Sequence, residues 1–384
     1  MERFKVVVCG GGVAGIEALL RLRHLAGDNV DITLLSPGDY LDYRPVAVLE
    51  PFDREPIRRY PIERIVADHG VRWIPDSLGW VDRFQHTVHC AATGESLVYD
   101  ALLLAVGGRA RPTNPHMDVF TSPQGEKAYA DILQELEAGK LTDLAFVVPE
   151  GPSWPLPLYE LALMTARRAN DRDQRLRISL ITPDARPLAV FGAQASTVVS
   201  RLLSGAGVTL YCGTTADMQK DRCLVLHPSG VELHPQHTVT LPRITGPDVR
   251  GIPGDPTHRF LEIDLHCRVA RTDGSIFAAG DATNFPVKHG AISAQQADTA
   301  AAGIAHLAGA GPRSEPLHPI LRTKLLTGHE PLYLSAHVIA GQGWNAEIHH
   351  EPPWGTEAKI VAAELGPYLK SIEDSAAVRS VEFC

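Results

Sequence analysis

Three closely spaced glycines near the N-terminus carry the clearest chemical signal in the sequence. Gly10, Gly12 and Gly15 have the GxGxxG spacing, directly follow an apolar run over residues 5–9, and open a helical pattern. In such a turn Gly10 makes the tight bend, Gly12 lets the backbone approach a pyrophosphate, and Gly15 lets helix and strand pack closely. The pattern therefore predicts a binding site for a dinucleotide.

The residues around this turn complete the predicted site. Val13 and Ala14 lie within the turn at the start of the helix, so we count them among the binding residues. About 20 residues further on, such sites usually carry an acidic side chain that holds a ribose hydroxyl, but Ser36 stands there in this chain. Serine can still make one hydrogen bond, and Asp39 or Asp42 nearby can compensate.

The composition is that of an ordinary globular protein. The 384 residues contain 36 Lys+Arg and 45 Asp+Glu, which gives a formal charge of −9, and 44% of the residues are hydrophobic. The acidic balance disfavours electrostatic binding to nucleic acid, so we expect no such partner. The six cysteines form no CxxC pair and no closely spaced Cys/His set, so we expect neither a disulfide framework nor a metal site.

Buried strands alternate with helices along most of the chain, which predicts an α/β fold. The first unit has expected strands over 5–9, 30–35 and 101–106 and a helix over 13–25. The second unit has expected helices over 125–140, 158–169 and 193–204, and strands over 144–148, 176–181 and 208–212. A strand over 275–279 and a helix over 291–308 follow. Residues 313–384 are expected to form a small, largely irregular cap.

The sequence predicts a cytoplasmic protein with at most a peripheral contact at the inner face of a membrane. It begins without the long apolar region of a signal peptide, and no apolar run approaches the roughly 20 residues of a membrane-spanning helix. A helical pattern over 357–372 has an apolar face made of Ile360, Val361, Leu365, Tyr368, Leu369 and Ile372. Such a face packs on the protein's own body or on a second copy in a homo-oligomer, or it docks on a membrane surface.

Two further segments resemble known flavoprotein signatures. Residues 99–107 (YDALLLAVG) resemble the second signature, and residues 274–282 (GSIFAAGDA) the third, of flavoproteins with two dinucleotide-binding domains. Together with the glycine turn they make the chain similar, over essentially its whole length, to the pyridine nucleotide-disulfide oxidoreductase superfamily. The loop 39–45 and the run 281–301 most resemble its branch of type II NADH dehydrogenases and sulfide:quinone oxidoreductases.

The resemblance implies bound FAD and two Rossmann-like dinucleotide-binding domains. The FAD domain would be discontinuous, at 1–113 and 246–312, with a second Rossmann-like domain at 114–245 and a C-terminal cap domain at 313–384.

Several FAD contacts follow from the same resemblance. Asp281 would bind the ribityl chain, and Arg44 and Pro45 would lie near the flavin ring. The helix start at Ala291 would direct its positive end at the flavin pyrimidine. The other cofactor-binding residues implied by the signatures are Ala105, Gly107 and Gly280.

Three side chains are candidates for catalysis. Lys288, just before the helix that begins near Ala291, would stabilise the anionic reduced flavin, or it is simply a solvated lysine. His289 is a candidate for proton transfer because an imidazole titrates near neutral pH, or it has a structural or merely polar role. Glu160 matches in position a glutamate of the NADH dehydrogenases, or it is an ordinary residue of the first helical turn.

The second unit departs from the family pattern at the turn where NAD(P)H would bind. Residues 149–157 (PEGPSWPLP) keep one glycine, Gly151, of the expected GxGxxG. Prolines remove backbone donors, and Trp154 would fill space that a pyrophosphate needs, so NAD(P)H as a substrate is left open. Trp154 would otherwise belong to a lid over the substrate or flavin, or to a rigid loop.

The leading hypothesis is an FAD-dependent oxidoreductase that passes electrons from a two-electron donor to a quinone or another small acceptor. Sulfide and disulfide chemistry of the usual kind is not expected, because no cysteine falls where those enzymes keep their reactive thiols. Two alternatives stay open: a flavin-containing binding or regulatory subunit, and an electron-transfer partner for another redox protein.

Overall fold

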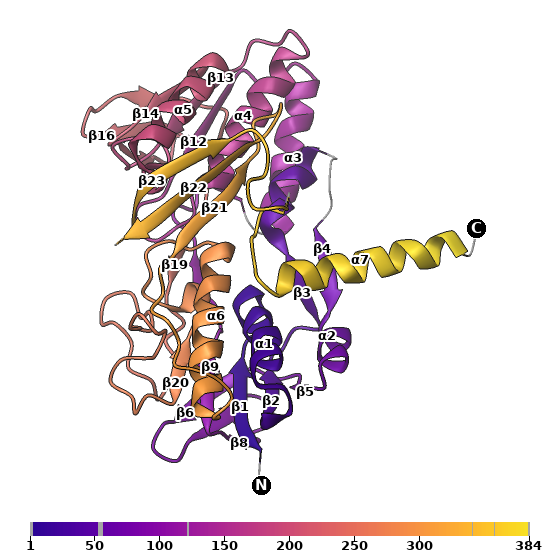
Figure 1. Ribbon diagram of the computed structural model, residues 1–384. Helices are drawn as coiled ribbons and strands as arrows, with labels where there is room; N and C mark the ends of the chain where they lie inside the picture. Colours follow the sequence, from indigo (N-terminus) through magenta and orange to yellow (C-terminus); the bar gives the residue numbers. More distant parts are fainter. Residues whose placement is uncertain (1–2, 53–56, 121–122, 340, 357, 383–384) are drawn as a thin grey trace.

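A five-stranded parallel sheet forms the first half of the fold (Figure 1). The computed structural model describes residues 3–52, 57–120, 123–339, 341–356 and 358–382. The strand order is β20-β9-β1-β2-β5. The strands are β1 (Phe4–Cys9), β2 (Val30–Leu35), β5 (Arg72–Ile74), β9 (Ala101–Leu104) and β20 (Ile276–Ala278). Because all of them run parallel, their carboxyl ends meet at one edge of the sheet.

The two faces of this sheet are covered by different layers. Helices α1 (Val13–Ala26) and α6 (Gly290–Leu307) lie side by side on one face (Figure 1). An antiparallel sheet of β6 (Leu78–Asp82), β7 (Thr87–Cys90) and β8 (Ser96–Val98) covers the other. The sheet is therefore buried on both sides, which explains why its strands are nearly continuous apolar runs.

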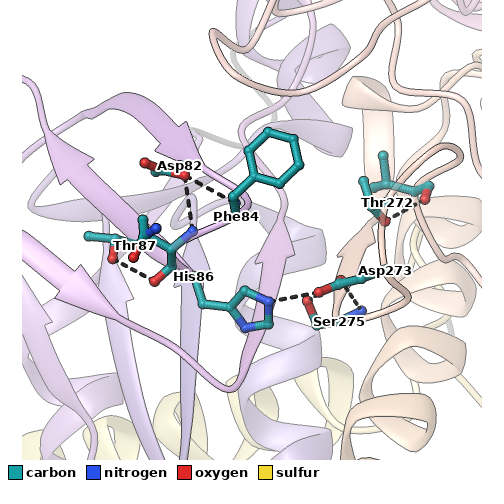
Figure 2. Close-up of polar contacts among 9 residues, drawn as sticks. Asp82, Phe84, His86, Thr87, Thr272, Asp273 and Ser275 are labelled. Atoms are coloured by element: carbon teal, nitrogen blue, oxygen red, sulfur yellow. Dashed lines mark hydrogen bonds and ion pairs between the residues drawn. The ribbon is translucent and has the colours of Figure 1, made fainter.

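The turn between β6 and β7 is fastened to the segment that leads into β20. Figure 2 shows Asp82 accepting hydrogen bonds from the backbone N–H groups that follow it, and the His86 ring facing the Asp273 carboxylate. The distance from His86 Nε2 to that carboxylate is 2.7 Å. Asp273 also accepts hydrogen bonds from the backbone N–H and hydroxyl of Ser275. These contacts fix the start of β20, and β20 in turn positions residues 280 and 281.

The second half repeats this arrangement with a sheet of order β11-β18-β12-β13-β14. Its parallel strands are β11 (Asp118–Val119), β12 (Asp143–Val147), β13 (Arg177–Ile181), β14 (Val208–Tyr211) and β18 (His237–Thr240). Helices α3 (Pro123–Glu137), α4 (Leu156–Asn170) and α5 (Gly192–Gly205) share the core on one face. A meander of β15 (Thr215–Met218), β16 (Leu224–His227) and β17 (Glu232–Leu233) covers the other.

The predicted α/β class with two Rossmann-like units is confirmed, and the predicted strands and helices of both units are present with ends that differ by a few residues. The chain crosses between the sheets through the antiparallel pair β10 (Arg109–Arg111) and β19 (Arg243–Thr245). The domain boundaries at 113, 245 and 312 remain a prediction. The remaining short elements are β3 (Tyr40–Tyr43), β4 (Arg58–Pro61), α2 (Ile62–Asp68) and the 3-10 turns η1 (Gly27–Asn29) and η3 (Ala189–Phe191).

The C-terminal segment is more regular than expected. Instead of irregular chain, it contains an antiparallel sheet of β21 (Ile320–Leu325), β22 (Leu332–Ile339) and β23 (Gln342–His349). The buried side of this sheet packs into the same core as α4 and α5, so the cap is built onto the second half of the fold. The alternating burial along β21 is the signal that the expectation of an irregular cap overlooked.

The last helix begins later than predicted. Helix α7 spans Leu365–Glu382, so Ile360 and Val361 precede it, and Glu357 lies outside the described residues. Leu365, Leu369 and Ile372 pack into the core with α1, while the helix reaches away from the body of the molecule (Figure 1). The apolar face therefore covers the protein's own surface in this region. Within the described part of the chain, no helix combines the length and apolar character needed to cross a membrane.

A buried carboxyl pair joins α1, α6 and the start of α7. Glu17 of α1 accepts hydrogen bonds from the backbone N–H groups of Glu364 (3.0 Å) and Leu365 (2.6 Å), so it caps α7. Asp298 of α6 lies next to Glu17. Burial, followed by the charge of Glu17, raises the pKa of Asp298 to about 8.

Because the pKa of Asp298 is raised in the folded protein, we predict that its contribution to the free energy of unfolding falls as the pH rises. The folded protein keeps a proton on Asp298 that the unfolded chain releases near its ordinary pKa of about 3.9, so the stabilisation is complete below that pH and lost through about pH 8. We expect Asp298→Asn to flatten the dependence of melting temperature on pH between 5 and 9. Equal slopes for wild type and variant would contradict this assignment.

Candidate functional site: a dinucleotide-binding turn and a buried ion pair

Glycines shape the turn after β1 so closely that other residues cannot replace them. Gly10 has a φ of +117°, and a Cβ there would overlap the carbonyl oxygen of Ala105. A Cβ on Gly15 would overlap the carbonyl oxygen of Gly10, so α1 starts in direct contact with the turn. Gly107, just after β9, has a φ of +71°. These are the close approaches that a dinucleotide-binding turn requires.

Gly12 faces open space at the start of α1. A Cβ on Gly12 would have no neighbour within 4 Å, and Gly12 makes no side-chain cap to the helix. The first N–H groups of α1, including those of Val13 and Ala14, have no partner within the helix and lie at the positive end of its dipole. No acidic residue occupies the first turn. This arrangement fits the pyrophosphate of FAD.

Two further predicted residues meet at this turn. Ser36, which follows β2, packs against Gly11, where an added Cβ would lie 2.5 Å from the serine Oγ. Gly280 opens the 3-10 turn η4 (Gly280–Ala282), and its φ of +79° lets it pass close to Ala14. The ends of β1, β2 and β20 thus bring their predicted residues to one edge of the first sheet.

Lys288 is a buried cation that stabilises the η4 turn. Its Nζ donates hydrogen bonds to the carbonyl oxygens of Thr283 (2.5 Å) and Asp281 (3.3 Å) and lies 3.8 Å from the centre of the Phe260 ring. Burial lowers the pKa of Lys288 to about 8, although Asp281 and Asp255 oppose this shift. Burial also raises the pKa of the Asp281 carboxyl, which Lys288 lowers. The alternative that Lys288 is simply a solvated lysine is therefore wrong. The role of Lys288 toward the flavin stays a prediction.

Arg44 and Pro45 begin the 3-10 segment η2 (Arg44–Phe52). The Arg44 guanidinium pairs with the buried carboxylate of Glu126 on α3. Burial raises the pKa of Glu126, and Arg44 lowers it. The pair connects the loop after β3 to a helix of the second half, and the proximity of Arg44 and Pro45 to the flavin ring stays a prediction.

His289 caps α6 at the place where the flavin pyrimidine is predicted to lie. Its Nδ1 accepts a hydrogen bond from the backbone N–H of Ala291 at 3.2 Å. Burial, and then the charge of Lys359, lowers the pKa of His289 to about 3. The ring is therefore neutral and holds its proton on Nε2. In this state His289 positions the start of α6, and it cannot act as an imidazolium acid near pH 7.

Gln296 is a positioning residue that sequence reasoning missed. Its Oε1 accepts a hydrogen bond from the backbone N–H of Gly280 at 2.7 Å, and its side chain is buried next to Thr283. It ties α6 to the η4 turn. A glutamine on the buried side of an alanine-rich helix was the available signal.

A buried ion pair links α4 to the segment before α7. Lys359 Nζ lies 2.6 Å from Glu160 Oε2, and their side chains are 8% and 0% exposed. The other oxygen of Glu160 accepts a hydrogen bond from the backbone N–H of Leu326 at 3.0 Å. Burial raises the pKa of Glu160 and lowers that of Lys359, while the charge of each residue opposes the shift of the other. The pair holds both groups where a proton can be exchanged.

This pair lies beside the start of α6. Ile360, next to Lys359, packs so closely on Gly290 that a Cβ there would overlap it. The Trp154 ring lies 4.5 Å from the His289 ring, centre to centre. We call Trp154, Glu160, His289 and Lys359 the Lys359 cluster. Sequence reasoning found three of its members separately but missed Lys359, which is 199 positions from its partner.

A cavity of about 340 Å³ lies at the carboxyl ends of β12 and β13, where the second unit would bind a nucleotide. The residues that line it include Gly151, Trp154, Glu150 and Asp184. The prolines of the turn offer no N–H to a phosphate group. Two carboxylates add negative charge, although burial raises the pKa of Asp184. The cavity therefore suits a pyrophosphate poorly, as the degraded motif predicts.

The described cysteines are not prepared for nucleophilic chemistry. They are Cys9, Cys90, Cys212, Cys223 and Cys267, all free. In each of them burial is the largest cause of a raised pKa, so none is held as a thiolate. Cys384 lies outside the described residues.

The fold and the glycine turn define a protein with two Rossmann-like halves, of which the first has the geometry of an FAD site. Residues 4–303 match the family model described as pyridine nucleotide-disulphide oxidoreductase, so the chain belongs to this family and is a flavin-dependent oxidoreductase.

Solved structures share this fold. The sulfide:quinone oxidoreductase from the hyperthermophilic bacterium Aquifex aeolicus is 20% identical, with 90% of this chain and 86% of that chain covered at a TM-score of 0.81. The reductase of the covalent putidaredoxin reductase–putidaredoxin complex is 19% identical. The match covers 88% of this chain and 82% of that chain, with a TM-score of 0.64. NDH2 from Plasmodium falciparum, solved in complex with NADH, is 16% identical. The match covers 73% of this chain and 65% of that chain, with a TM-score of 0.58.

Proposed function

We propose that this protein is an FAD-dependent oxidoreductase whose flavin takes two electrons from a small donor and gives them to a quinone. The observation that carries this proposal is the Lys359 cluster, a buried acid–base pair beside the start of α6. Bound FAD supplies the two-electron chemistry. The chain's own residues bind it through the α1 start and η4 turn, and they supply the protons that quinone reduction consumes.

Lys359 is the proposed proton donor to the quinone. Its ammonium group carries a proton on Nζ, and burial already lowers the pKa of that group, so the proton is more easily released than from a solvated lysine. The carboxylate of Glu160, 2.6 Å away, keeps Nζ in place and neutralises its charge. His289 keeps its neutral ring between Trp154 and the α6 start.

An apolar groove of about 610 Å³ lies beside the segment that leads into Lys288, and we propose that a quinone enters through it. The groove is lined by side chains from residues 263–265 and 284–286, from the segment before β21, and from β22 and β23, including Leu265, Phe285, Val338, Ile339 and Trp344. Leu265, Ile339 and Trp344 are more than half exposed. We propose that this rim, and not α7, makes any peripheral contact with a membrane, from which an apolar quinone would enter.

An anaerobic reduction experiment tests the proposal. The holoprotein is titrated first with NADH and then with dithionite, followed by a water-soluble quinone, while the oxidised-flavin absorption band is recorded. We expect NADH to bleach the band slowly or not at all, because the cavity at the second turn lacks backbone donors. We expect dithionite to bleach the band fully and the quinone to restore it within seconds.

Each outcome separates the alternatives. A reduced flavin that the quinone does not reoxidise would overturn the proposed acceptor and favour a redox partner protein. Rapid bleaching by NADH would show that the proline-rich turn admits a nicotinamide, and NAD(P)H would then be the donor.

A further inference from the structure

Three side chains that can ligate a metal lie together on the meander that covers the second sheet. Cys223, Glu232 and His234 each place one ligand atom within 4.8 Å of the others. Cys223 is buried, while Glu232 and His234 are exposed. They share no residue with the glycine turn after β1, the η4 turn or the Lys359 cluster, and nothing in the proposed redox function uses them.

The strand register explains why these residues meet. In the antiparallel pair β16–β17, Leu224 lies opposite Leu233 and Val225 opposite Glu232. Continuing this register by one position places Cys223 opposite His234. Because side chains alternate between the faces of a strand, residues 223, 232 and 234 share one face, whereas Leu224 and Leu226 point into the core on the other.

The ligand types select the metal. We propose that Cys223, Glu232 and His234 form a Zn²⁺ site that clips β16 to β17. Thiolate, imidazole and carboxylate are the ligands that Zn²⁺ takes in proteins, and three protein ligands leave the fourth tetrahedral position to a water molecule. The turn over 219–222 leads directly into the cysteine, and Asp221 accepts a hydrogen bond from the Cys223 N–H at 3.1 Å.

Binding exchanges a proton for the metal. The S–H bond of Cys223 breaks, its proton goes to solvent, and the sulfur takes the zinc ion. The carboxylate and the imidazole each bind through a lone pair, without a further bond change. The thiol therefore releases one proton per zinc ion bound, and no oxidant or reductant is required.

The test measures Zn²⁺ binding to the holoprotein by competition with a chromogenic zinc indicator, together with Co²⁺ substitution. We expect one zinc equivalent per chain, a cobalt spectrum with a thiolate charge-transfer band, and a melting temperature that rises with Zn²⁺. His234→Ala removes an exposed side chain, so folding should be unaffected, and it should weaken Zn²⁺ binding by at least about tenfold. Cys223→Ser should abolish the charge-transfer band.

A matched control lies on the same strand. His227 is half exposed and lies 3.4 Å from the carboxylate of Asp217, but no cysteine accompanies it. His227→Ala should leave both the affinity and the cobalt spectrum unchanged. The proposal is overturned if wild type binds no Zn²⁺, or if His234→Ala binds it as tightly as wild type, because the ion would then occupy other histidines. The flavin spectrum should be the same in all variants, so this result does not depend on the redox proposal.

Discussion

Lys359→Met should nearly abolish reoxidation of the reduced flavin by quinone. The substitution keeps the apolar stem but removes the ammonium group, so the proposed proton donor is lost while Glu160 stays fully buried. Loss of a positioned acid typically costs about 10² to 10⁴ in rate. We expect a fall of at least about 100-fold in the single-turnover rate, measured by stopped-flow mixing of dithionite-reduced protein with quinone.

The same substitution should also destabilise the fold. Removing one partner of a buried ion pair costs about 3–5 kcal/mol, because the remaining charge has no partner, and protonation of Glu160 will recover part of this. Urea unfolding of apoprotein and holoprotein measures the loss. Lys370→Met is the matched control, since Lys370 is an exposed lysine of α7. It should change neither the stability nor the rate.

A double variant separates chemistry from stability. In Glu160→Gln/Lys359→Met both charges are gone, so the stability should return toward that of wild type. The rate of reoxidation should stay low, because no proton donor has been restored. If the double variant recovers the rate together with the stability, Lys359 acts only through folding and the proposed proton transfer is wrong.

The features that could be predicted from the sequence are those that a local residue pattern determines. The glycine turn and the helix that follows it are contiguous within residues 10–26, so their spacing alone determines the geometry. The Lys359 cluster could not be assembled this way, because Glu160, His289 and Lys359 come from distant segments that only the tertiary fold brings together. Trp154 and His289 were each found beside motifs. Lys359 lies within the stretch 357–372 that was predicted to be helical, although the helix begins only at Leu365, and nothing local marks the lysine as buried.

The proximity of the proposed zinc ligands on the β15–β17 meander could not be predicted from the sequence either, because it depends on strand register. Cys223 and His234 are eleven positions apart, which is not a spacing of known metal motifs, and only the pairing of β16 with β17 places them opposite each other. The same holds for Glu17 and Asp298, whose helices pack side by side although most of the chain separates them. In both pairs the tertiary fold, rather than the residue types, brings the two side chains together.

Gly12→Asp should abolish FAD binding while stabilising the apoprotein. Gly12 has φ and ψ of −83° and −173°, which any residue adopts, and an added side chain would meet no neighbour within 4 Å. Aspartate is a favoured N-cap, and its charge suits the helix dipole, so α1 should gain about 1 kcal/mol in the absence of flavin. The same carboxylate would face the pyrophosphate, and this repulsion should weaken FAD affinity by at least about 100-fold.

Two control variants distinguish the effect of the added charge on FAD affinity from the effect of the added side-chain volume and from that of a carboxylate placed elsewhere on the surface. Gly12→Asn offers a similar cap without the charge, so it should retain more FAD than Gly12→Asp in a fluorescence titration of apoprotein. Gly205→Asp adds a carboxylate at an exposed position of α5, again with no neighbour within 4 Å, and should leave FAD affinity unchanged. If Gly12→Asp binds FAD as wild type does, the start of α1 is not the pyrophosphate site. Because the apoprotein is expected to become more stable, a loss of flavin cannot then be attributed to unfolding.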